Sequence, residues 1–193
     1  MDLHAELRVG EYHLRTLAPD DAGLVVEATV TEHAPAAWGP RPAGPYTLDD
    51  AVAALRAWDP DSAGRASIGI FDGDRLVGAI GIFDGDRLVG AIGLMPDGPS
   101  SAELGYWVRP ECRGRGIAWR CVAALTGWAH RAVSLDRIWL EIDPTNAASS
   151  RVAQRAGFHL EGRLARHCRS WTHDDPALDS WHDCDIWVHS AAE

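Results

Sequence analysis

The segment from Glu103 to Trp128 constrains the fold of this 193-residue chain more than any other. Its first residues, through Val108, have the pattern of a strand, which Pro110 ends because proline removes a donor from a sheet ladder. A turn rich in glycine and arginine follows, and apolar residues then recur at helical spacing. A strand, a glycine-rich turn and a helix in this order direct backbone N–H groups and a helix N-terminus at one spot. Such a spot is typical of an anion site, and phosphate is the usual anion.

Three kinds of anion-binding loop compete for this segment. A P-loop is excluded because no lysine follows the glycines. A dinucleotide fingerprint is disfavoured because Trp119 occupies the third small position, where a helix must pack closely on a strand. The third pattern, Gln/Arg-x-x-Gly-x-Gly/Ala, matches at Arg113, Gly116 and Ala118.

This third pattern resembles the pyrophosphate loop of the GNAT superfamily of N-acetyltransferases, which bind acyl-coenzyme A. A second segment, Asn-x-x-Ser-x-Arg-Val at 146–152 with Gly-Phe at 157–158, resembles another motif of the same superfamily. Together with Ala102–Trp107 ahead of the loop, the two motifs resemble the branch of ribosomal-protein-alanine N-acetyltransferases. The resemblance covers most of the chain and is sharpest from Ala102 to Phe158.

The resemblance implies an α/β GNAT fold: a mixed, mostly antiparallel sheet of six to seven strands flanked by about four helices. We expect residues 1–193 to form a single domain, since this length is ordinary for one. The residue pattern predicts two strands, 102–108 and 137–143, that run parallel and are joined by the main helix. It also predicts strands over 7–17, 158–167 and 181–188, and helices over 20–31, 47–58, 115–132 and 144–157.

A twelve-residue unit occurs twice in tandem, as Gly69–Ile80 and Gly81–Ile92. Each copy places Asp-Gly-Asp between apolar runs, which is a hairpin signal. One copy supplies two strands, Ala66–Phe71 and Arg75–Ile80, whereas one further reversal would send the next strand the wrong way. We therefore expect the sheet to use one turn, with the surplus copy looped out or lengthening a ribbon at the sheet edge. An added edge strand would favour a homodimer.

Composition narrows the partners of the chain. The net charge of −10 argues against non-specific binding to nucleic acid, and favours a cationic amine substrate or solubility alone. No apolar run approaches the length of a membrane span, and the N-terminus has no secretory pattern. The four cysteines form no Cys-x-x-Cys pair, so we expect reduced thiols and a cytoplasmic location.

The resemblance implies acetyl-CoA as co-substrate and assigns residues to bind it. The pantetheine arm would lie along the backbone of Tyr106, Trp107 and Val108. Asn146 and Ser149 would contact the cofactor near its sulfur, although Asn146 can equally be a plain helix cap. The pyrophosphate would lie on the loop formed by Arg113, Gly114, Arg115, Gly116, Ile117 and Ala118, whose arginines can also be solvated helix-start charges.

Acyl transfer to an amine needs a base and, for the leaving thiolate, an acid. The resemblance assigns Glu103 as the base, against a purely structural role, and Glu141, Asp143 and His33 are its rivals. It assigns Ser149 as the acid, because no tyrosine occurs on the helix that follows Asn146 or beyond it. Three aromatic residues from the early helices and their loop are candidate walls of the acceptor pocket, or else core: Trp38, Tyr46 and Trp58.

A metal site is not expected, because strand alternation brings only His182 and Cys184 together. The sequence favours an acetyl-CoA-dependent N-acyltransferase acting on a primary amine, either a protein N-terminus or a small amine. A different acyl group such as succinyl, and a CoA-binding module without catalysis, remain alternatives. A nucleotide-binding oxidoreductase is disfavoured by Trp119 and by the missing upstream βαβ unit.

Overall fold

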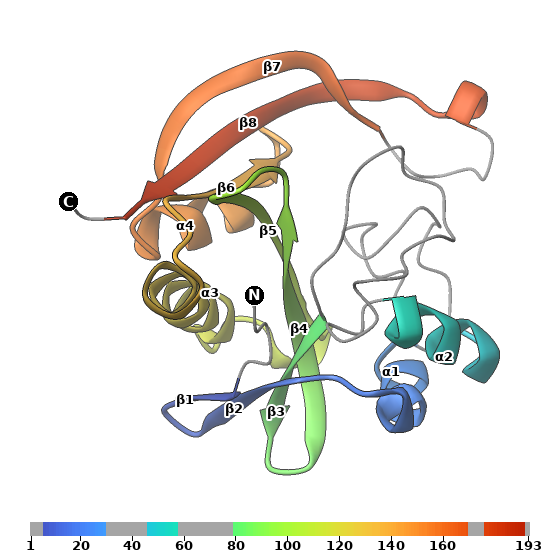
Figure 1. Ribbon diagram of the computed structural model, residues 1–193. Coiled ribbons are helices and arrows are strands. Elements are labelled where there is room, and N and C mark those ends of the chain that lie inside the picture. The colour runs from blue at the N-terminus through green and yellow to red at the C-terminus, as the bar shows by residue number, and fades with distance from the viewer. Residues whose placement is uncertain (1–5, 30–45, 58–78, 170–175, 192–193) are drawn as a thin grey trace.

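The computed structural model describes residues 6–29, 46–57, 79–169 and 176–191. Their strands form one eight-stranded sheet with the order β1-β2-β3-β4-β5-β6-β8-β7 (Figure 1). The strands are β1 Glu6–Val9, β2 Tyr12–Thr16, β3 Ala79–Asp84, β4 Arg87–Pro96, β5 Ser101–Val108, β6 Arg137–Ile142, β7 His159–Arg169 and β8 Trp181–Ser190. The α-helices are α1 Ala22–Thr29, α2 Leu48–Ala57, α3 Ile117–Trp128 and α4 Ala147–Arg155. None of the described helices is both long and apolar enough to cross a membrane.

The sheet is mixed, and its single parallel pair is β5 with β6, as expected. It has more strands than expected because the chain reverses inside the strand predicted over 7–17. Gly10 adopts φ +65° at that reversal, a conformation that suits glycine, and β1 and β2 then pair antiparallel. The alternation of apolar and polar residues thus runs on through Gly10, and it gave no indication of the turn there.

The second copy of the repeated unit forms the β3–β4 hairpin. Its Asp-Gly-Asp turn lies between Asp84 and Arg87, and Gly85 has φ +58°. The strand expected over 66–71 and most of the first copy lie outside the described residues. β4 then pairs antiparallel with β5, so the direction of the remaining strands is kept. The use of a single turn, and any dimer that the surplus copy would favour, stay predictions.

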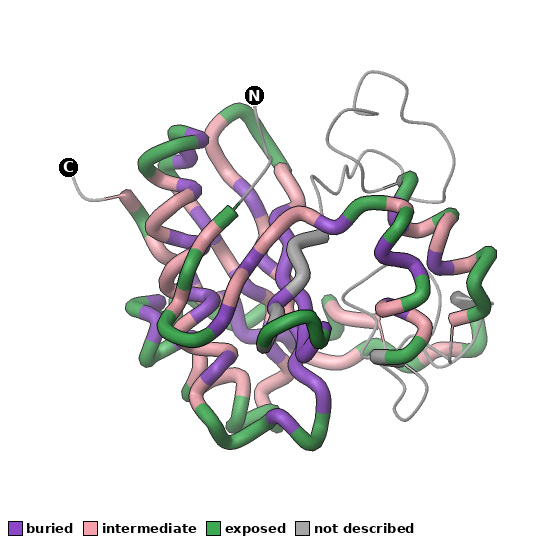
Figure 2. The backbone as a smooth tube through the Cα atoms, turned by 90° about the horizontal axis from the view of Figure 1, so that it is seen from below, coloured by how far each residue is buried: buried purple, intermediate pink, exposed green. Residues whose placement is uncertain are grey.

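Helices cover both faces of the sheet, α3 and α4 on one and α1 and α2 on the other (Figure 1). Side chains alternate along β5, so Leu104 is buried under α3, whereas Trp107 packs with α1 and α2 on the opposite face. Figure 2 shows the buried positions running through the central strands between the two helical layers. The two faces are thus separate compartments that meet along β5.

Cys168 of β7 and Cys184 of β8 are joined by a disulfide bond, whereas the sequence led us to expect reduced thiols. The strands pair antiparallel with a register shift between Leu164 and Cys168, and the two cysteine Cα atoms lie 5.9 Å apart. That separation is ordinary for a disulfide. Strand alternation could not predict the pairing, because it depends on the extra residues in β7. Cys112 and Cys121 are free and buried.

Asp21 connects β2 to the start of α1, and its loss should weaken the fold in a pH-dependent way. Arg15 donates two hydrogen bonds of 2.7 Å to its carboxylate, and the Ala18 N–H donates a third of 2.9 Å. The bonds from Arg15 hold the pKa of Asp21 below its usual value. The carboxylate therefore stabilises the fold above its unfolded pKa, and this contribution is lost as pH falls through the lower folded pKa. We expect Asp21→Asn to cost about 2 kcal/mol at neutral pH and less in acid, as measured by urea unfolding across pH.

Candidate active site

A gap opens between β5 and β6, and it positions the site. The two strands pair only from Ser101↔Arg137 to Glu103↔Trp139. β5 continues along β4 as far as Val108, and β6 continues along β8 as far as Ile142, so the parallel strands part at their carboxyl ends. The Arg109 N–H bonds to β4, so by alternation the main-chain groups of Tyr106 and Val108 face the gap. An extended ligand arm can be bound there by strand addition.

The loop after β5 presents a helix N-terminus beside this gap. A short 3₁₀ helix, Pro110–Cys112, turns the chain, and Gly114 and Gly116 follow with φ +78° and +75°. Gly116 is the residue before α3, and its carbonyl accepts the first helical bond from the Arg120 N–H. The preceding N–H groups of the first turn have no partner inside the helix, which makes them donors for an anion.

A pocket of about 230 Å³ lies between this loop and α4. Six residues that the resemblance assigned to the cofactor line it, together with Cys112, Trp119 and one face of α4. From the assigned set these are Val108, Arg113, Gly114, Gly116, Ile117 and Ala118; from α4 they are Ala148, Arg151, Val152 and Arg155. The structure thus brings most of the predicted pyrophosphate loop to one cavity.

Five of the predicted cofactor residues do not line this pocket: Tyr106, Trp107, Arg115, Asn146 and Ser149. Arg115 is exposed and does not line the pocket, and its carbonyl accepts a bond of 3.0 Å from Arg120. The side chain of Trp107 packs on the opposite face of the sheet, so only its backbone can take part. Arg113 lines the pocket but also bonds the Val108 carbonyl oxygen at 2.9 Å, which folds the loop back on β5.

Arg151 and Arg155 are pocket cations to which the sequence analysis gave no role. They recur at i and i+4 on α4 with Ala148 and Val152, a spacing that places all four on one helix face.

We expect Arg151→Ala and Arg155→Ala each to weaken acetyl-CoA binding about 5- to 20-fold, because a charge-assisted bond to phosphate is lost. Calorimetric titration at two salt concentrations should show a smaller salt dependence in each variant. Arg131→Ala, at the far end of the main helix, should bind as wild type.

The start of α4 brings Ser149 close to β5. Asn146 caps this helix by accepting a 3.1 Å bond from the Ser149 N–H, so the capping role of Asn146 is present, and its amide nitrogen can still donate to a ligand. Burial raises the pKa of Tyr106, and the Ser149 side chain partly offsets that rise. The Tyr106 hydroxyl is buried and has no partner of hydrogen-bond geometry among the described residues. The hydroxyl groups of Tyr106 and Ser149 therefore lie close together beside the gap. The sequence suggested a role for the Ser149 hydroxyl but none for that of Tyr106.

Glu103 lies where the strands begin to part, on the opposite face from Tyr106. It is half-buried, pairs across to Trp139, and alternates onto the face that Trp107 shares with α1 and α2. An amine that approaches from the α1–α2 side would reach Glu103 at the root of the gap. The structure thus places the predicted base and the predicted cofactor pocket on opposite faces of β5.

The rival bases are engaged in other contacts. Two hydrogen bonds of 2.7 Å from Thr145, through its hydroxyl and its N–H, lower the pKa of Asp143. One oxygen of Glu141 lies 2.8 Å from His167 Nε2, and the other lies 3.2 Å from the Cys168 sulfur. His33 lies outside the described residues. All three described carboxylates are half-buried, so the preference for Glu103 rests on its position where β5 and β6 begin to part.

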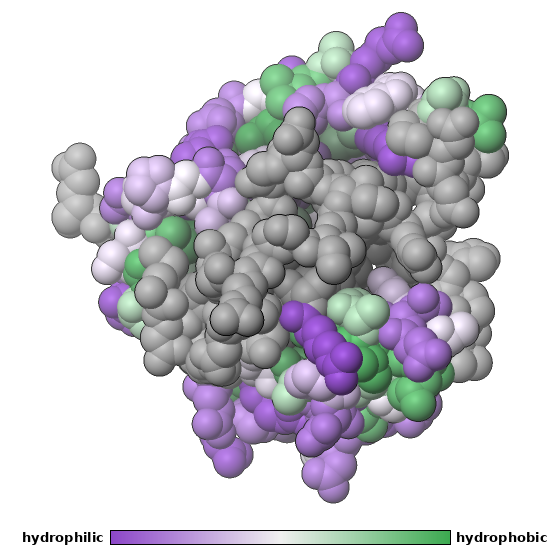
Figure 3. Space-filling model, turned by 45° about the vertical axis from the view of Figure 1, so that its right-hand side comes forward, coloured by the Kyte–Doolittle hydropathy of each residue, from purple (hydrophilic) through white to green (hydrophobic). Residues whose placement is uncertain are grey.

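The predicted acceptor walls are described only in part. Tyr46 is half-buried and packs against the cluster that α1 and α2 form with Trp107. Trp38 and Trp58 lie outside the described residues. Figure 3 shows hydrophilic and hydrophobic residues intermingled over the described part of one side of the molecule.

Comparison with known proteins identifies the family of the chain. The family model of the acetyltransferase (GNAT) domain matches residues 12–159, so the chain belongs to the GNAT acetyltransferase family. The probable N-acetyltransferase YjcK of Bacillus subtilis (strain 168) is 36% identical over 62 residues, which are 32% of this chain and 34% of that protein. The matched region thus spans about a third of that curated relative.

Solved structures share the fold over nearly the whole chain. RimL, a ribosomal L7/L12 alpha-N-protein acetyltransferase in complex with coenzyme A, matches with a TM-score of 0.77 and 17% identity, covering 96% of this chain and 98% of that chain. RimJ of Mycobacterium smegmatis, in complex with CoA-disulfide, matches with a TM-score of 0.73 and 24% identity, covering 98% and 88%. At these identities the likenesses show that the fold is shared.

Proposed function

We propose that this chain is an acyl-CoA-dependent N-acyltransferase that transfers acetyl from acetyl-CoA to a primary amine by direct attack. The observation that carries the proposal is the pocket between the Arg113–Ala118 loop and α4, which opens beside the gap between β5 and β6. It offers helix N-terminal donors and arginines to a pyrophosphate, and main-chain groups of β5 to an extended arm. The structural relatives solved with coenzyme A or CoA-disulfide support this choice of carrier.

In the proposed reaction the chain holds both reactants and moves protons. The N–H groups facing the gap would bond the thioester carbonyl oxygen, where negative charge develops as the amine attacks. Glu103, directly or through water, would accept the proton that the amine loses. A new C–N bond forms as the C–S bond breaks. The leaving sulfur takes a proton from the Ser149 hydroxyl, which takes one in turn from the Tyr106 hydroxyl, and solvent returns a proton to Tyr106. A thiolate is a good leaving group, so this acid should matter less than the base.

The acceptor is proposed as a primary amine, either a protein N-terminus or a small amine. The net charge of −10 suits a cationic acceptor. The names of RimL and of the Vibrio fischeri ribosomal-protein-S5-alanine acetyltransferase favour protein N-termini. We place the reaction in the cytoplasm and in a single domain, as the sequence analysis expected.

The proposal is tested by a thiol-release assay with acetyl-CoA and succinyl-CoA against a panel of N-terminal peptides and small amines. Release of CoA that depends on one class of amine, with mass-spectrometric detection of the acetylated product, is the expected result. Tight acetyl-CoA binding without turnover of any amine would instead support a CoA-binding module. Failure of every CoA ester to bind the folded chain would refute the proposal.

Tyr106 provides a sharper test of the acid. Burial raises the pKa of the phenol, so it stays protonated at neutral pH and can donate. If Tyr106 and Ser149 form one relay, Tyr106→Phe and Ser149→Ala should each lower kcat about 3- to 10-fold, and the double variant should be no slower than the slower single variant. The dissociation constant for acetyl-CoA should change little in Tyr106→Phe. Multiplying effects in the double variant would show that the two hydroxyls act separately.

A further inference from the structure

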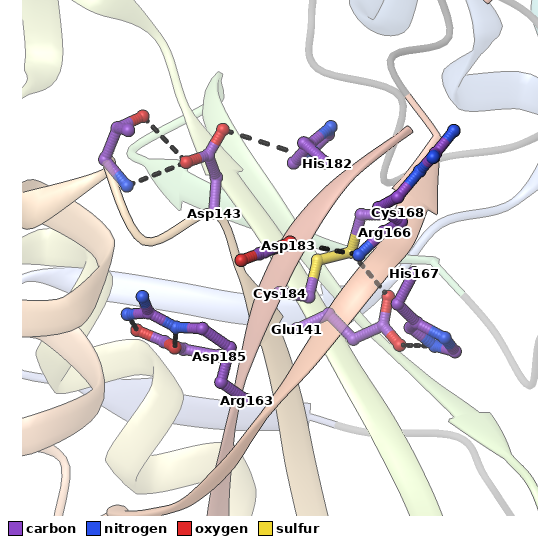
Figure 4. The surroundings of a disulfide bond; sticks show 11 residues. Glu141, Asp143, Arg163, Arg166, His167, Cys168, His182, Asp183, Cys184 and Asp185 are labelled. Carbon is purple, nitrogen blue, oxygen red and sulfur yellow. Dashed lines mark hydrogen bonds and ion pairs between the residues drawn. A yellow bond between two sulfur atoms is a disulfide. The ribbon is translucent and has the colours of Figure 1, made fainter. Parts of the chain in front are cut away.

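A cluster of potential metal ligands joins β6, β7 and β8 on the face of the sheet opposite α3 and α4. The Cys168 and Cys184 sulfurs and a ring nitrogen of His182 all lie within 4.8 Å of one another. Glu141 adds a carboxylate oxygen 3.2 Å from the Cys168 sulfur. Figure 4 shows His182 and Glu141 beside the sulfur pair. The alternation of β6 and its pairing with β8 put Glu141 and Cys184 on the same face.

The contact between Glu141 and Cys168 depends on the redox state of the sulfur. A disulfide sulfur carries no proton, so it cannot donate a hydrogen bond to the Glu141 carboxylate. In the reduced chain a Cys168 thiol could donate to this carboxylate, or the sulfur and the carboxylate could bind one cation.

The surroundings also resemble the outer shell of a metal centre. The second Glu141 oxygen lies 2.8 Å from His167 Nε2, which orients the carboxylate. The Asp143 carboxylate lies 3.7 Å from His182 Nε2, and carboxylates of this kind orient metal-bound histidines (Figure 4). Cys184 is buried and Cys168 half-buried, which limits competition from water.

We propose that, when the disulfide is reduced, Cys168, Cys184 and His182 bind one Zn²⁺ ion, with Glu141, beside Cys168, as the fourth ligand. Two sulfurs, one imidazole nitrogen and one carboxylate oxygen make a four-ligand set suited to tetrahedral zinc. A dithiol reductant supplies two electrons and two protons, so the disulfide becomes two thiols and the reductant becomes a disulfide. Each thiol releases its proton as its sulfur binds the cation.

Zinc binding would replace one cross-link between strands, the disulfide, with another. In the oxidised chain the disulfide joins only β7 and β8, whereas zinc would also join β6 through Glu141. Cytoplasmic thiols are normally kept reduced, so the metal-bound form suits the location that we propose. Glu141 and Glu103 lie on the same face of the sheet, because Glu103 pairs with Trp139 and Glu141 follows two residues later. A metal here would therefore lie on the acceptor side of the sheet, away from the cofactor pocket.

The test titrates Zn²⁺, and Co²⁺ as a spectroscopic probe, into the full chain after reduction by a phosphine and anaerobic removal of the reagent. One equivalent should bind the reduced chain, with cobalt bands of a tetrahedral site that includes thiolate. The oxidised chain should bind at least about 100-fold more weakly, because its sulfurs are no longer ligands. Cys168→Ser and Cys184→Ser should lose the cobalt–thiolate band, and Glu141→Gln should weaken binding about 10- to 100-fold.

Cys121→Ala is the matched control, since Cys121 is a buried free cysteine of α3 that lies outside the cluster. It should still bind one equivalent with the wild-type cobalt spectrum. Reduced wild type that binds no stoichiometric metal, or cysteine variants that bind as wild type does, would overturn the inference. The readout is independent of acyl transfer, so it holds whether or not the proposed activity is found.

Discussion

Gly116→Trp should abolish measurable acetyl-CoA binding while leaving the chain folded. Gly116 has φ +75°, and even a Cβ atom there would lie 2.9 Å from Trp119 Nε1, in the first turn of α3. An indole would fill the approach to the N–H groups that we assign to the pyrophosphate. Losing two charge-assisted bonds costs about 3–6 kcal/mol, which corresponds to a loss in affinity of about 100-fold or more. Calorimetric titration of acetyl-CoA measures the effect, with NAD as a ligand that should not bind either protein.

Two control variants separate blocked access from damage to the fold. Gly114→Ala carries the same kind of backbone cost, since Gly114 has φ +78°, but its added methyl group meets nothing within 4 Å. Gly98→Trp adds equal bulk in an exposed turn with open space around it. The first should lower the free energy of unfolding by about 1–2 kcal/mol yet retain most binding, and the second should bind as wild type. Undiminished binding by Gly116→Trp would refute the assignment of the loop.

The sequence predicted best where short-range chemistry determines the structure. The loop from Arg113 to Ala118 and the capped start of α4 were predicted because glycine conformation, helix capping and residue order are local properties. The parallel pairing of β5 with β6 also followed, since a helix of the right length joins them. These features account for most of the cofactor pocket.

The structure differs from the sequence-based predictions where contacts between distant segments determine which residues lie together. The approach of Tyr106 to Ser149 joins β5 to α4, and no spacing within either segment signals it. The disulfide of Cys168 with Cys184 depends on a register shift in β7 that alternation cannot reveal. The position of Arg155 in the pocket needed the orientation of α4 against the loop. The local sequence pattern thus predicted where the helices and strands lie, whereas the packing between them determines which side chains come together in the site.

Glu103→Gln should lower kcat by about 10²- to 10⁴-fold, the range expected when a general base is removed. The glutamine keeps the size and the half-buried position of the side chain but cannot accept the amine proton. Acetyl-CoA should bind Glu103→Gln with the wild-type dissociation constant, because the cofactor pocket lies on the other side of β5. The rate of the wild-type enzyme should rise with pH as the base loses its proton, and the variant should lose that dependence.

The matched control for Glu103 is Glu141→Gln, which removes a rival carboxylate on the same face of the sheet. Glu141 is held by His167, so in the disulfide-bonded chain, for which we propose no metal, its replacement should leave the pH profile of kcat in its wild-type form. Glu103→Asp, with a carboxylate one methylene shorter, should recover part of the rate if Glu103 acts through a water molecule. A merely structural Glu103 predicts a different pattern: Gln and Asp variants would both lower the unfolding temperature, and kcat would keep its dependence on pH. The pH profile therefore separates a catalytic Glu103 from one that only supports the strand.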